Sequence, residues 1–372
     1  MPVVSRHEDE IDWHEVDPDI GSIDRRKLSH AVDLIQSRQT AAQLCVIRHG
    51  RLVIERSFGC DPQALFWIFS ASKPYVAMLV HLLADRGAFS LDDAISAHWP
   101  QFAANGKHAI TIRQVLQHRS GLSASGTALG DLSSLTHWRR SVRRMERARP
   151  RWTPGEVPAY LPLGYGFILG ELVQRVTGRP VAEALEKELL RPLGARDTFL
   201  GLPRAQWRRH VPIRASRSRD LLVQLIANRS STRRAVIPAG GISCTASDLA
   251  RFYFMLLRSG RYAGRHIMSA AAVKEARVPS NESELDRTAR LYIRWAQGFQ
   301  LGGPRVDPGS VSSFGRLSSP SAFGHNGSNC CIGWADPDRD LVFAYLTNRL
   351  STRKEGATHL ASVADAVISS CL

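Results

Sequence analysis

The sequence predicts an α+β fold, an α/β sandwich in which helices flank an antiparallel sheet of about five or more strands and a large, mostly helical lobe is inserted between those strands. Three observations predict it. β-rich runs lie near the start of the chain, similar runs lie near its end, and helical patterns fill the region between them.

The first strands are expected in "AQLCVIRHGRLVIERSFG", residues 42–59, where two β-rich runs flank His49-Gly50 as in a hairpin. Residues 322–348 contain two or three further runs, two of them joined by the turn "DPDRD". Each hairpin alone would leave strand edges unpaired and one face uncovered, so both ends of the chain are expected to share one sheet. The expected organisation is a single domain over 1–372, with a polar extension (1–25), a largely helical lobe (60–290) and a sheet lobe (30–59 and 291–372). A crevice between the lobes is the natural ligand site.

Helices are expected through the middle of the chain. An apolar-periodic stretch over 70–86 stops at Gly87, and another over 163–177 stops at Gly178. The capping pairs Thr111 with Gln114 and Thr245 with Asp248 predict helices that run to Gly121 and Gly260, and a final helix is expected over 356–370. Residues 203–240 are rich in arginine with little periodicity, so they form either a flap over the crevice or an exposed loop, the interpretation we favour.

Composition excludes several classes of function. The 372 residues carry a formal charge of +15, which attracts polyanions, but the arginine-rich stretches 137–152 and 207–236 match no groove-reading module, so no specific nucleic-acid site is expected. The six cysteines show no C-x-x-C pair and no histidine at zinc spacing, so neither a metal nor a cofactor is expected. The first 20 residues lack an apolar leader and no run of about 18 apolar residues follows, so we expect no transmembrane segment and a cytoplasmic location.

The chemistry is expected in "FWIFSASKPYVAML", residues 66–79, where Ser70 and Lys73 stand three residues apart. If a helix begins near Ser70, the two side chains share one face and the first N–H groups of the helix point at the serine oxygen. Pro74 is tolerated in a first turn, where its missing N–H breaks no helical bond. The S-x-x-K pattern alone is weak evidence, because Ser351 and Lys354 supply a second match in a polar segment, which we interpret as accidental.

Further segments occur in a characteristic order: "ITIRQVLQHRSGLS" (110–123), "TPGEVPAYLPLGYGFILGELVQRVTGRP" (153–180), "RPLGARDTFLG" (191–201), "PAGGISCTASDLARF" (238–252) and "FGHNGS" (323–328). With Ser70 and Lys73 they resemble the penicillin-recognising serine hydrolases, in particular the branch of AmpC-type β-lactamases, D-aminopeptidases, D-alanyl-D-alanine carboxypeptidases and β-lactamase-like carboxylesterases. The resemblance covers approximately 40–350.

The resemblance implies roles for individual residues. Ser70 would be the acyl-accepting nucleophile, with Lys73 and Tyr160 as its proton acceptors, and the backbone N–H groups of Ser70 and Ser328 would form the oxyanion hole. The family's third motif falls on His325, Asn326 and Gly327, which are therefore expected to contact substrate. A cation 4 Å from a tyrosine returns about 4 kcal/mol at an effective dielectric of 20, comparable to the cost of ionising tyrosine at pH 7. Either Tyr160 or Lys73 can therefore be the base.

The chain departs from the family pattern at two positions. The second motif, usually Tyr-x-Asn, is Tyr160-Leu161-Pro162 here, and proline has neither an N–H nor a polar side chain to bind an acyl-amide. The third motif begins with His325 in place of lysine, which removes a permanent positive charge. Leu161, Pro162 and Trp334 are expected to make the crevice more apolar, and His118 is expected to be structural.

These features favour a serine hydrolase acting on small to medium acyl esters, since an alkoxide leaves with less proton assistance than an amine. The alternatives are a β-lactamase, D-amino-acid amidase or DD-peptidase with the same catalytic residues, an inactive binding protein on the same fold, and a polyanion binder. The expected partner is a small-molecule ester or amide. The sequence defines neither the native substrate nor the number of subunits.

Overall fold

The computed structural model describes residues 8–17, 23–123, 134–282, 284–304, 307 and 311–371. Its main sheet has six antiparallel strands in the order β2-β1-β12-β11-β10-β9. The strands are β1 (Ala42–Arg48), β2 (Arg51–Phe58), β9 (Gln300–Leu301), β10 (Phe323–Gly327), β11 (Cys331–Asp336) and β12 (Leu341–Thr347). The prediction that both ends of the chain share one antiparallel sheet is confirmed.

The pairing of β1 joins the two ends of the chain. Ala42 lies opposite Thr347 and Arg48 opposite Leu341, while the other edge of β1 pairs with β2 across the predicted turn at His49-Gly50. Both turn residues have positive φ values, 51° and 73°, as tight hairpin turns require. All seven residues of β1 are buried, because helices cover both faces of the sheet.

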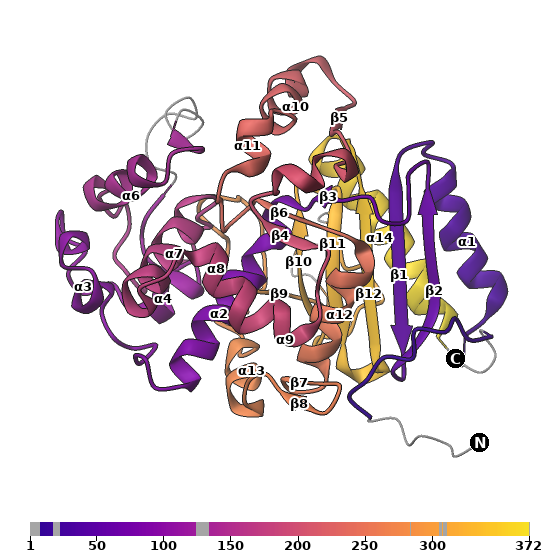
Figure 1. Cartoon of the computed structure of the whole chain (residues 1–372), viewed down its shortest axis with the longest axis horizontal. Coiled ribbons are helices and arrows are strands. Elements are labelled where there is room, and N and C mark those ends of the chain that lie inside the picture. Colours follow the sequence, from indigo (N-terminus) through magenta and orange to yellow (C-terminus); the bar gives the residue numbers. More distant parts are fainter. Residues whose placement is uncertain are drawn as a thin grey trace.

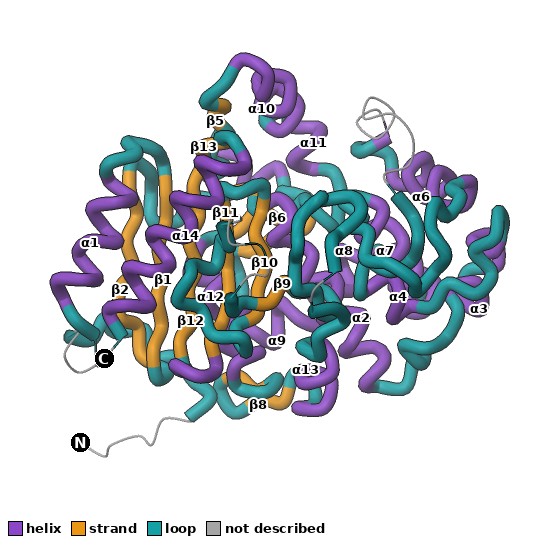
Figure 2. The backbone as a smooth tube through the Cα atoms, turned by 180° about the vertical axis from the view of Figure 1, so that it is seen from behind, coloured by secondary structure: helices purple, strands orange, loops and turns teal. Residues whose placement is uncertain are grey.

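The sheet is the middle layer of three. On one face lie α1 (Arg25–Gln36) and α14 (Arg353–Ser370), which pack on each other and on the apolar side chains of β1, β11 and β12. On the other face lies α12 (Ala246–Leu257), in contact with the same three strands. Figure 1 shows α12 in front of the sheet, and the reversed view in Figure 2 shows α1 and α14 in front. The final helix starts at Arg353, three residues before its predicted start, because Thr352 caps it.

A helical region lies beside the sheet and is organised around α2 (Lys73–Asp85) and α7 (Gly164–Thr177), which pack together. Residues 73–83 of α2 are all buried, as expected for a helix that is apolar on nearly every side. Further helices described in the same part of the sequence are α3 (Ile95–His98), α4 (Ile112–Leu116), α6 (Trp138–Arg147), α8 (Val181–Leu185), α9 (Arg191–Leu193) and α13 (Ala270–Ala276). A π-helical turn lies at Glu186–Leu190, and 3₁₀ turns lie at Phe69–Ser72, Pro100–Ala103, Arg204–Arg209 and Ser218–Asp220 and, between β11 and β12, at Pro337–Arg339. The predicted lobe boundaries stay predictions; α12 falls within 60–290 in sequence and packs on the sheet.

Most predicted helix ends agree with the structure. The capping box of Thr111 and Gln114 is present, Thr245 caps α12, and α7 ends at Gly178 with a φ of 68°. The helix predicted to run to Gly121 is shorter, since α4 ends at Leu116. His118 adopts a left-handed φ of 57°, which a continuing helix does not permit.

The segment expected as an exposed loop over 203–240 contains short regular elements, so that expectation is wrong. They are β5 (Arg214–Ala215), α10 (Leu221–Ala227) and α11 (Ser230–Arg234). β5 pairs in parallel with β13 (Arg349–Leu350), just before α14. In both Figure 1 and Figure 2, α10 and α11 stand away from the body of the molecule.

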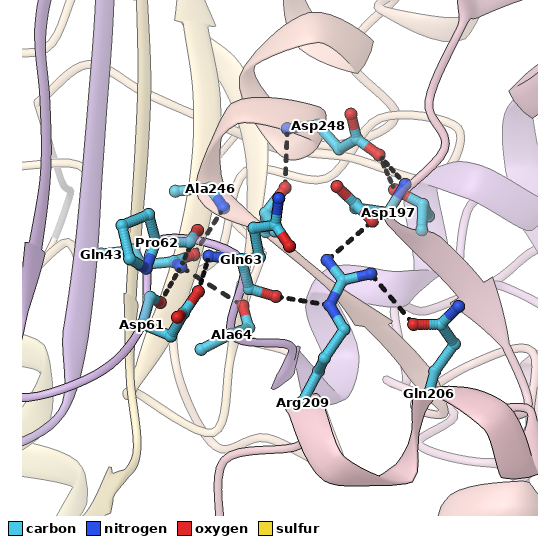
Figure 3. A network of polar contacts seen from close by, with 12 residues as sticks. Gln43, Asp61, Pro62, Gln63, Ala64, Asp197, Gln206, Arg209, Ala246 and Asp248 are labelled. Carbon is cyan, nitrogen blue, oxygen red and sulfur yellow. Dashed lines mark hydrogen bonds and ion pairs between the residues drawn. The ribbon is translucent and has the colours of Figure 1, made fainter.

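The connection from β2 to β3 (Phe66–Trp67), which leads to Ser70, is fixed by polar contacts. The Gln43 amide donates to Pro62 O at 2.9 Å and accepts from the N–H of Ala246 at 3.0 Å. From the other side, Arg209 donates to Gln63 O at 2.8 Å and forms an ion pair with Asp197 (Figure 3). β3 itself lies in a small sheet with β6 (Ile242–Cys244) and β4 (Thr198–Leu200), and β7 (Arg261–Tyr262) pairs with β8 (Arg265–His266).

Candidate active site

Ser70 lies in a single 3₁₀ turn, Phe69–Ser72, that continues directly into α2. The predicted helix start is therefore correct, although its first turn is tighter than an α-helix. Phe69 has a left-handed φ of 49°, which costs a non-glycine residue about 1–2 kcal/mol. The chain therefore turns sharply between β3 and the helix, with Ser70 at the turn and on the wall of a cavity.

Lys73 lies beneath Ser70 and is fully buried. Its Nζ is 2.7 Å from Pro162 O, 3.1 Å from Ala239 O and 3.4 Å from Ser70 Oγ. Within the described ranges no carboxylate forms an ion pair with it, and burial lowers the pKa of Lys73 well below its ordinary value. A neutral amine has two N–H groups for the two carbonyls and a lone pair for the serine proton.

Tyr160 approaches Ser70 from the other side. Its hydroxyl donates to Ser70 Oγ at 2.8 Å, and its ring stacks on Trp295 with centroids 5.4 Å apart and planes inclined by 3°. Burial raises the pKa of Tyr160 above its ordinary value, against the lowering effect of the hydrogen bond to Ser70. The sequence allowed either Tyr160 or Lys73 to be the base. These surroundings favour Lys73, because burial keeps the Tyr160 phenol protonated and the Lys73 amine unprotonated.

Asp286 holds Tyr160 in place, and the sequence did not predict it. Its buried carboxylate accepts from the backbone N–H of Tyr160 at 2.9 Å and from Trp295 Nε1 at 3.0 Å, and the N–H groups of Thr288 and Ala289 also donate to it. Asp286 lies 126 residues from Tyr160 in sequence. No local pattern marks residues 284–295, so only the folded arrangement reveals this contact.

Ser328 reaches the same cavity from the β10–β11 hairpin. Cys330 N–H donates to Gly327 O at 3.0 Å, and Ser328 and Asn329 both have left-handed φ values, 50° and 55°, as in a type I′ turn. Gly327 packs so closely on the chain before Ser70 that a Cβ there would lie 1.8 Å from Ile68 O. This contact sets the position of Ser328 relative to Ser70.

The cavity has a volume of about 680 Å³. It is lined by Ser70, Tyr160, Pro162, Thr288, Ala289, Leu291, Ile293, Trp295, Gln300, Val311, Ser313, His325, Asn326, Ser328, Asn329, Arg353, Lys354 and Ala357. Its walls therefore come from the helical region, residues 288–300, the sheet and the start of α14. A second cavity of about 960 Å³ opens beside β2 and residues 208–214 and contains none of the predicted catalytic side chains.

Two histidines, His118 and His325, lie close to the ring of Tyr160. The ring centroid of His118 is 4.8 Å from that of Tyr160, and its Nδ1 accepts from Leu161 N–H at 3.3 Å. His325 is buried against Asn326 O, and burial lowers its pKa to about 3. Burial also lowers the pKa of His118 well below its ordinary value. Both rings are therefore neutral at pH 7 and add no positive charge.

Two residues expected to line the site lie elsewhere. Leu161 is only 2% exposed and belongs to the core, and Trp334 is completely buried on the opposite face of the sheet, stacked on Phe343. Side chains alternate along a strand, and because neighbouring Gly333 faces Tyr253 and α12, Trp334 must face α1 and α14. Gly327 does not line the cavity either, and acts through its close contact with Ile68.

Residues 353 and 354 line the cavity, although the sequence predicted no role for them. Arg353 and Lys354 are exposed in the first turn of α14, and Arg353 donates to Ala289 O at 3.0 Å. Ser351, the partner of Lys354 in the second S-x-x-K match, does not line the cavity. Within the described residues, no three His, Cys, Asp or Glu side chains gather as a metal site, and each helix is too short or too polar to cross a bilayer.

Comparisons with known proteins find similar sequences and similar structures over most of the chain. The family model described as Beta-lactamase matches residues 25–368. The esterase/beta-lactamase LipL of Mycobacterium tuberculosis is 29% identical over 314 residues, which cover 76% of this chain and 69% of LipL. The N-acetylmuramyl-L-alanine amidase of Bacillus subtilis is 25% identical over 357 residues, with coverages of 84% and 77%.

Solved structures share the fold. A family VIII carboxylesterase superposes with a TM-score of 0.81 over 93% of this chain and 97% of its own, at 24% identity. A penicillin-binding protein homologue from Caulobacter crescentus superposes with a TM-score of 0.79 over 94% of this chain and 98% of its own, also at 24% identity. The fold class predicted from the sequence is confirmed by both matches.

Proposed function

The chain belongs to the beta-lactamase family of serine hydrolases, and from this premise we propose that it is a carboxylesterase that acts through an acyl-enzyme on Ser70. The observation that carries the proposal is the position of Ser70 Oγ, 2.8 Å from the Tyr160 hydroxyl and 3.4 Å from Lys73 Nζ. A hydroxyl that accepts from a phenol and faces a neutral amine can give up its proton as it attacks.

Acylation follows from these contacts. Ser70 Oγ attacks the ester carbonyl carbon while its proton passes to the Lys73 amine. The backbone N–H groups of Ser70 and Ser328 donate to the resulting oxyanion, each contributing roughly 3–4 kcal/mol of transition-state stabilisation. The C–O bond to the alcohol then breaks, and the leaving alkoxide takes a proton from Tyr160. The ammonium formed on Lys73 returns its proton to the resulting phenolate, so both groups regain their starting forms. In deacylation, water attacks the acyl carbonyl carbon and gives its proton to Lys73, and Ser70 Oγ leaves with a proton as the carboxylic acid is released.

The substrate is proposed to be an ester because two amide-binding features are missing. Pro162 lines the cavity where an asparagine would offer an amide, and His325 is neutral where a lysine would be charged. Leu291, Ile293 and Trp295 make part of the wall apolar, which suits short to medium acyl chains. This apolar wall replaces the one expected from Leu161 and Trp334. The esterase/beta-lactamase name of LipL supports the same chemistry.

Hydrolysis of lactams or D-peptides is the second candidate, and the cations of Arg353 and Lys354 favour it. Both line the cavity and can bind a substrate carboxylate in place of the lysine that the third motif lacks. Comparing nitrocefin with p-nitrophenyl butyrate ranks the two candidates, because every catalytic group is shared.

An intact-mass experiment tests the proposal. The protein is mixed with p-nitrophenyl butyrate, nitrocefin or a D-alanyl-D-alanine peptide and quenched within seconds. We expect a butyryl adduct that is absent in Ser70→Ala and retained in the matched control Ser351→Ala, which removes the serine of the second S-x-x-K match. Absence of any adduct, together with failure of a fluorophosphonate to label Ser70, would favour an inactive binding protein. A cytoplasmic location stays a prediction, which cell fractionation tests.

A further inference from the structure

The helix α10 exposes an unusual amount of apolar surface. Its Leu221, Leu222, Val223 and Leu225 are 51%, 54%, 42% and 56% exposed. We call these four residues the α10 patch. They are four of the six large hydrophobic side chains that are exposed in the described part of the chain, the others being Val278 and Leu317. Exposed hydrophobic residues are common when scattered, whereas a contiguous group marks an interaction surface.

Polar contacts, rather than burial of its leucines, hold α10 in place. Gln224 accepts from the N–H of Ala215 in β5 at 2.6 Å, and the Asn228 amide exchanges two hydrogen bonds with the backbone of Ile213, at 2.8 and 2.9 Å. The buried Arg233 donates to Ala227 O at 2.7 Å. The helix is thus attached by one side, and its apolar side chains are left pointing away from the core.

The surroundings of the α10 patch are positively charged. Arg214 in β5, Arg229 just after α10 and Arg234 in α11 are all exposed. Among the residues that the structure describes, none of the three has a carboxylate within ion-pair distance, whereas Arg217 is neutralised by Asp220. An apolar centre with a cationic rim is the surface that an anionic lipid interface complements.

The patch is also linked to the wall of the catalytic cavity. β5, which carries Arg214 and anchors Gln224, pairs with β13 (Arg349–Leu350), and the cavity residues Arg353 and Lys354 follow β13 within four positions. Figures 1 and 2 both show α10 and β5 projecting beyond the ends of the sheet strands. A surface bound to α10 therefore lies next to the segment that leads into the cavity wall.

We propose that the α10 patch docks the protein on an anionic phospholipid surface, with the leucines inserted at the level of the upper acyl chains and the arginines against the phosphates. This inference goes beyond ester hydrolysis and does not depend on Ser70. A second copy of the chain is a poorer occupant, because a two-fold pairing of the patches would bring the arginine rims of both copies together.

Vesicle co-sedimentation tests the proposal, using full-length protein with phosphatidylcholine vesicles and with vesicles of equal parts phosphatidylcholine and phosphatidylglycerol. We expect binding to the anionic vesicles, and Leu222→Ser with Leu225→Ser should weaken it about tenfold or more, since each serine removes an inserted isobutyl group. Arg229→Gln should weaken it about fivefold. The matched control, Val278→Ser with Leu317→Ser, removes the exposed apolar residues outside the patch and should bind as the wild type does.

The leucine variant should fold and should hydrolyse water-soluble p-nitrophenyl acetate at the wild-type rate, and Ser70→Ala should bind vesicles normally. Those two results separate lipid docking from the esterase proposal. Absence of wild-type binding, equal binding to both vesicle types, or undiminished binding of the leucine variant would overturn the proposal. So would a dimer, seen by light scattering, that the leucine variant converts to a monomer.

Discussion

Replacing Gly327 by alanine tests whether the hairpin after β10 sets the oxyanion geometry. A Cβ at this position would lie 1.8 Å from Ile68 O and 3.2 Å from Phe69 Cβ. Because real Cβ atoms are essentially never found closer than 3.0 Å to such neighbours, the two segments must separate by about 1.2 Å. Ile68 and Phe69 lead to Ser70, while Gly327 precedes Ser328, so the separation moves apart the two proposed N–H donors.

The expected cost falls on catalysis more than on folding. A displacement of about 1 Å in a catalytic site can lower the rate 100-fold, and loss of one oxyanion donor lowers kcat by about 10²–10³. We therefore expect kcat for p-nitrophenyl butyrate to fall by about 10²–10³ in Gly327→Ala. The added methyl group should lower the free energy of unfolding by only about 1–3 kcal/mol.

Steady-state kinetics and urea unfolding, measured on the same preparations, check this expectation. Gly87→Ala is the matched control, because no atom lies within 4 Å of the place its methyl group would occupy and its φ of 76° alone should cost about 1–2 kcal/mol of stability. That control should retain wild-type kcat. A folded Gly327→Ala protein with kcat within about threefold of the wild type would refute the proposed role of the hairpin.

Three further outcomes are expected. First, the ammonium form of Lys73 replaces the basic amine as the pH falls through its lowered pKa, so kcat/KM should fall on the acid side with a midpoint well below 10.5. At higher pH, kcat/KM should stay constant until Tyr160 ionises above pH 10. A pH-rate profile that rises only above pH 10 would contradict the assignment of Lys73 as the base. Second, Asp286→Asn turns an N–H₂ group toward the backbone and Trp295 N–H donors, so the free energy of urea unfolding should decrease by about 1–3 kcal/mol. Because Tyr160 then shifts, kcat should fall about tenfold or more. Wild-type values for both quantities would exclude the positioning role of Asp286. Third, burial lowers the pKa of His81 to about 3, so below pH 6.5 the unfolded chain binds a proton that the folded chain does not. The free energy of unfolding should therefore decrease as the pH falls from 6.5 toward 3, and His81→Gln should reduce that slope by up to about 1.4 kcal/mol per pH unit. An unchanged slope in this variant would contradict the lowered pKa of His81.

The parts of the fold that local sequence patterns encode were predictable. The hairpin at His49-Gly50, the cap at Thr245 and the glycine stop at Gly178 each depend on a few adjacent residues, and all three are confirmed. The two-residue strand β9 could not be predicted, because its pairing is decided by β10 rather than by its own residues. The short helices of residues 203–240 were not predicted, because α10 (LLVQLIA) is almost entirely apolar and shows no helical period of polar and apolar residues.

The candidate site was only partly accessible for the same reason. Ser70 and Lys73 are three residues apart, so a local helix start was enough to bring them together, and the resemblance supplied Tyr160. Asp286 and Trp295 join the site through contacts with distant segments that no short pattern records. The prediction that Trp334 lines the crevice was wrong, because residues close in sequence to His325 need not point to the same side of the sheet. Side chains alternate along β11, and Trp334 faces α1 and α14.

The pairing of β1 with β12 constrains how the protein is made. At about 5–20 residues per second, the ribosome needs roughly 15–60 s to synthesise the roughly 300 residues between these strands. During that time one edge of β1 has no partner, and the face that α12 covers stays open until residue 257 has been made. Nascent chains should therefore depend on chaperones until the last strand emerges, and a stop codon before residue 341 should yield aggregation rather than a smaller working enzyme.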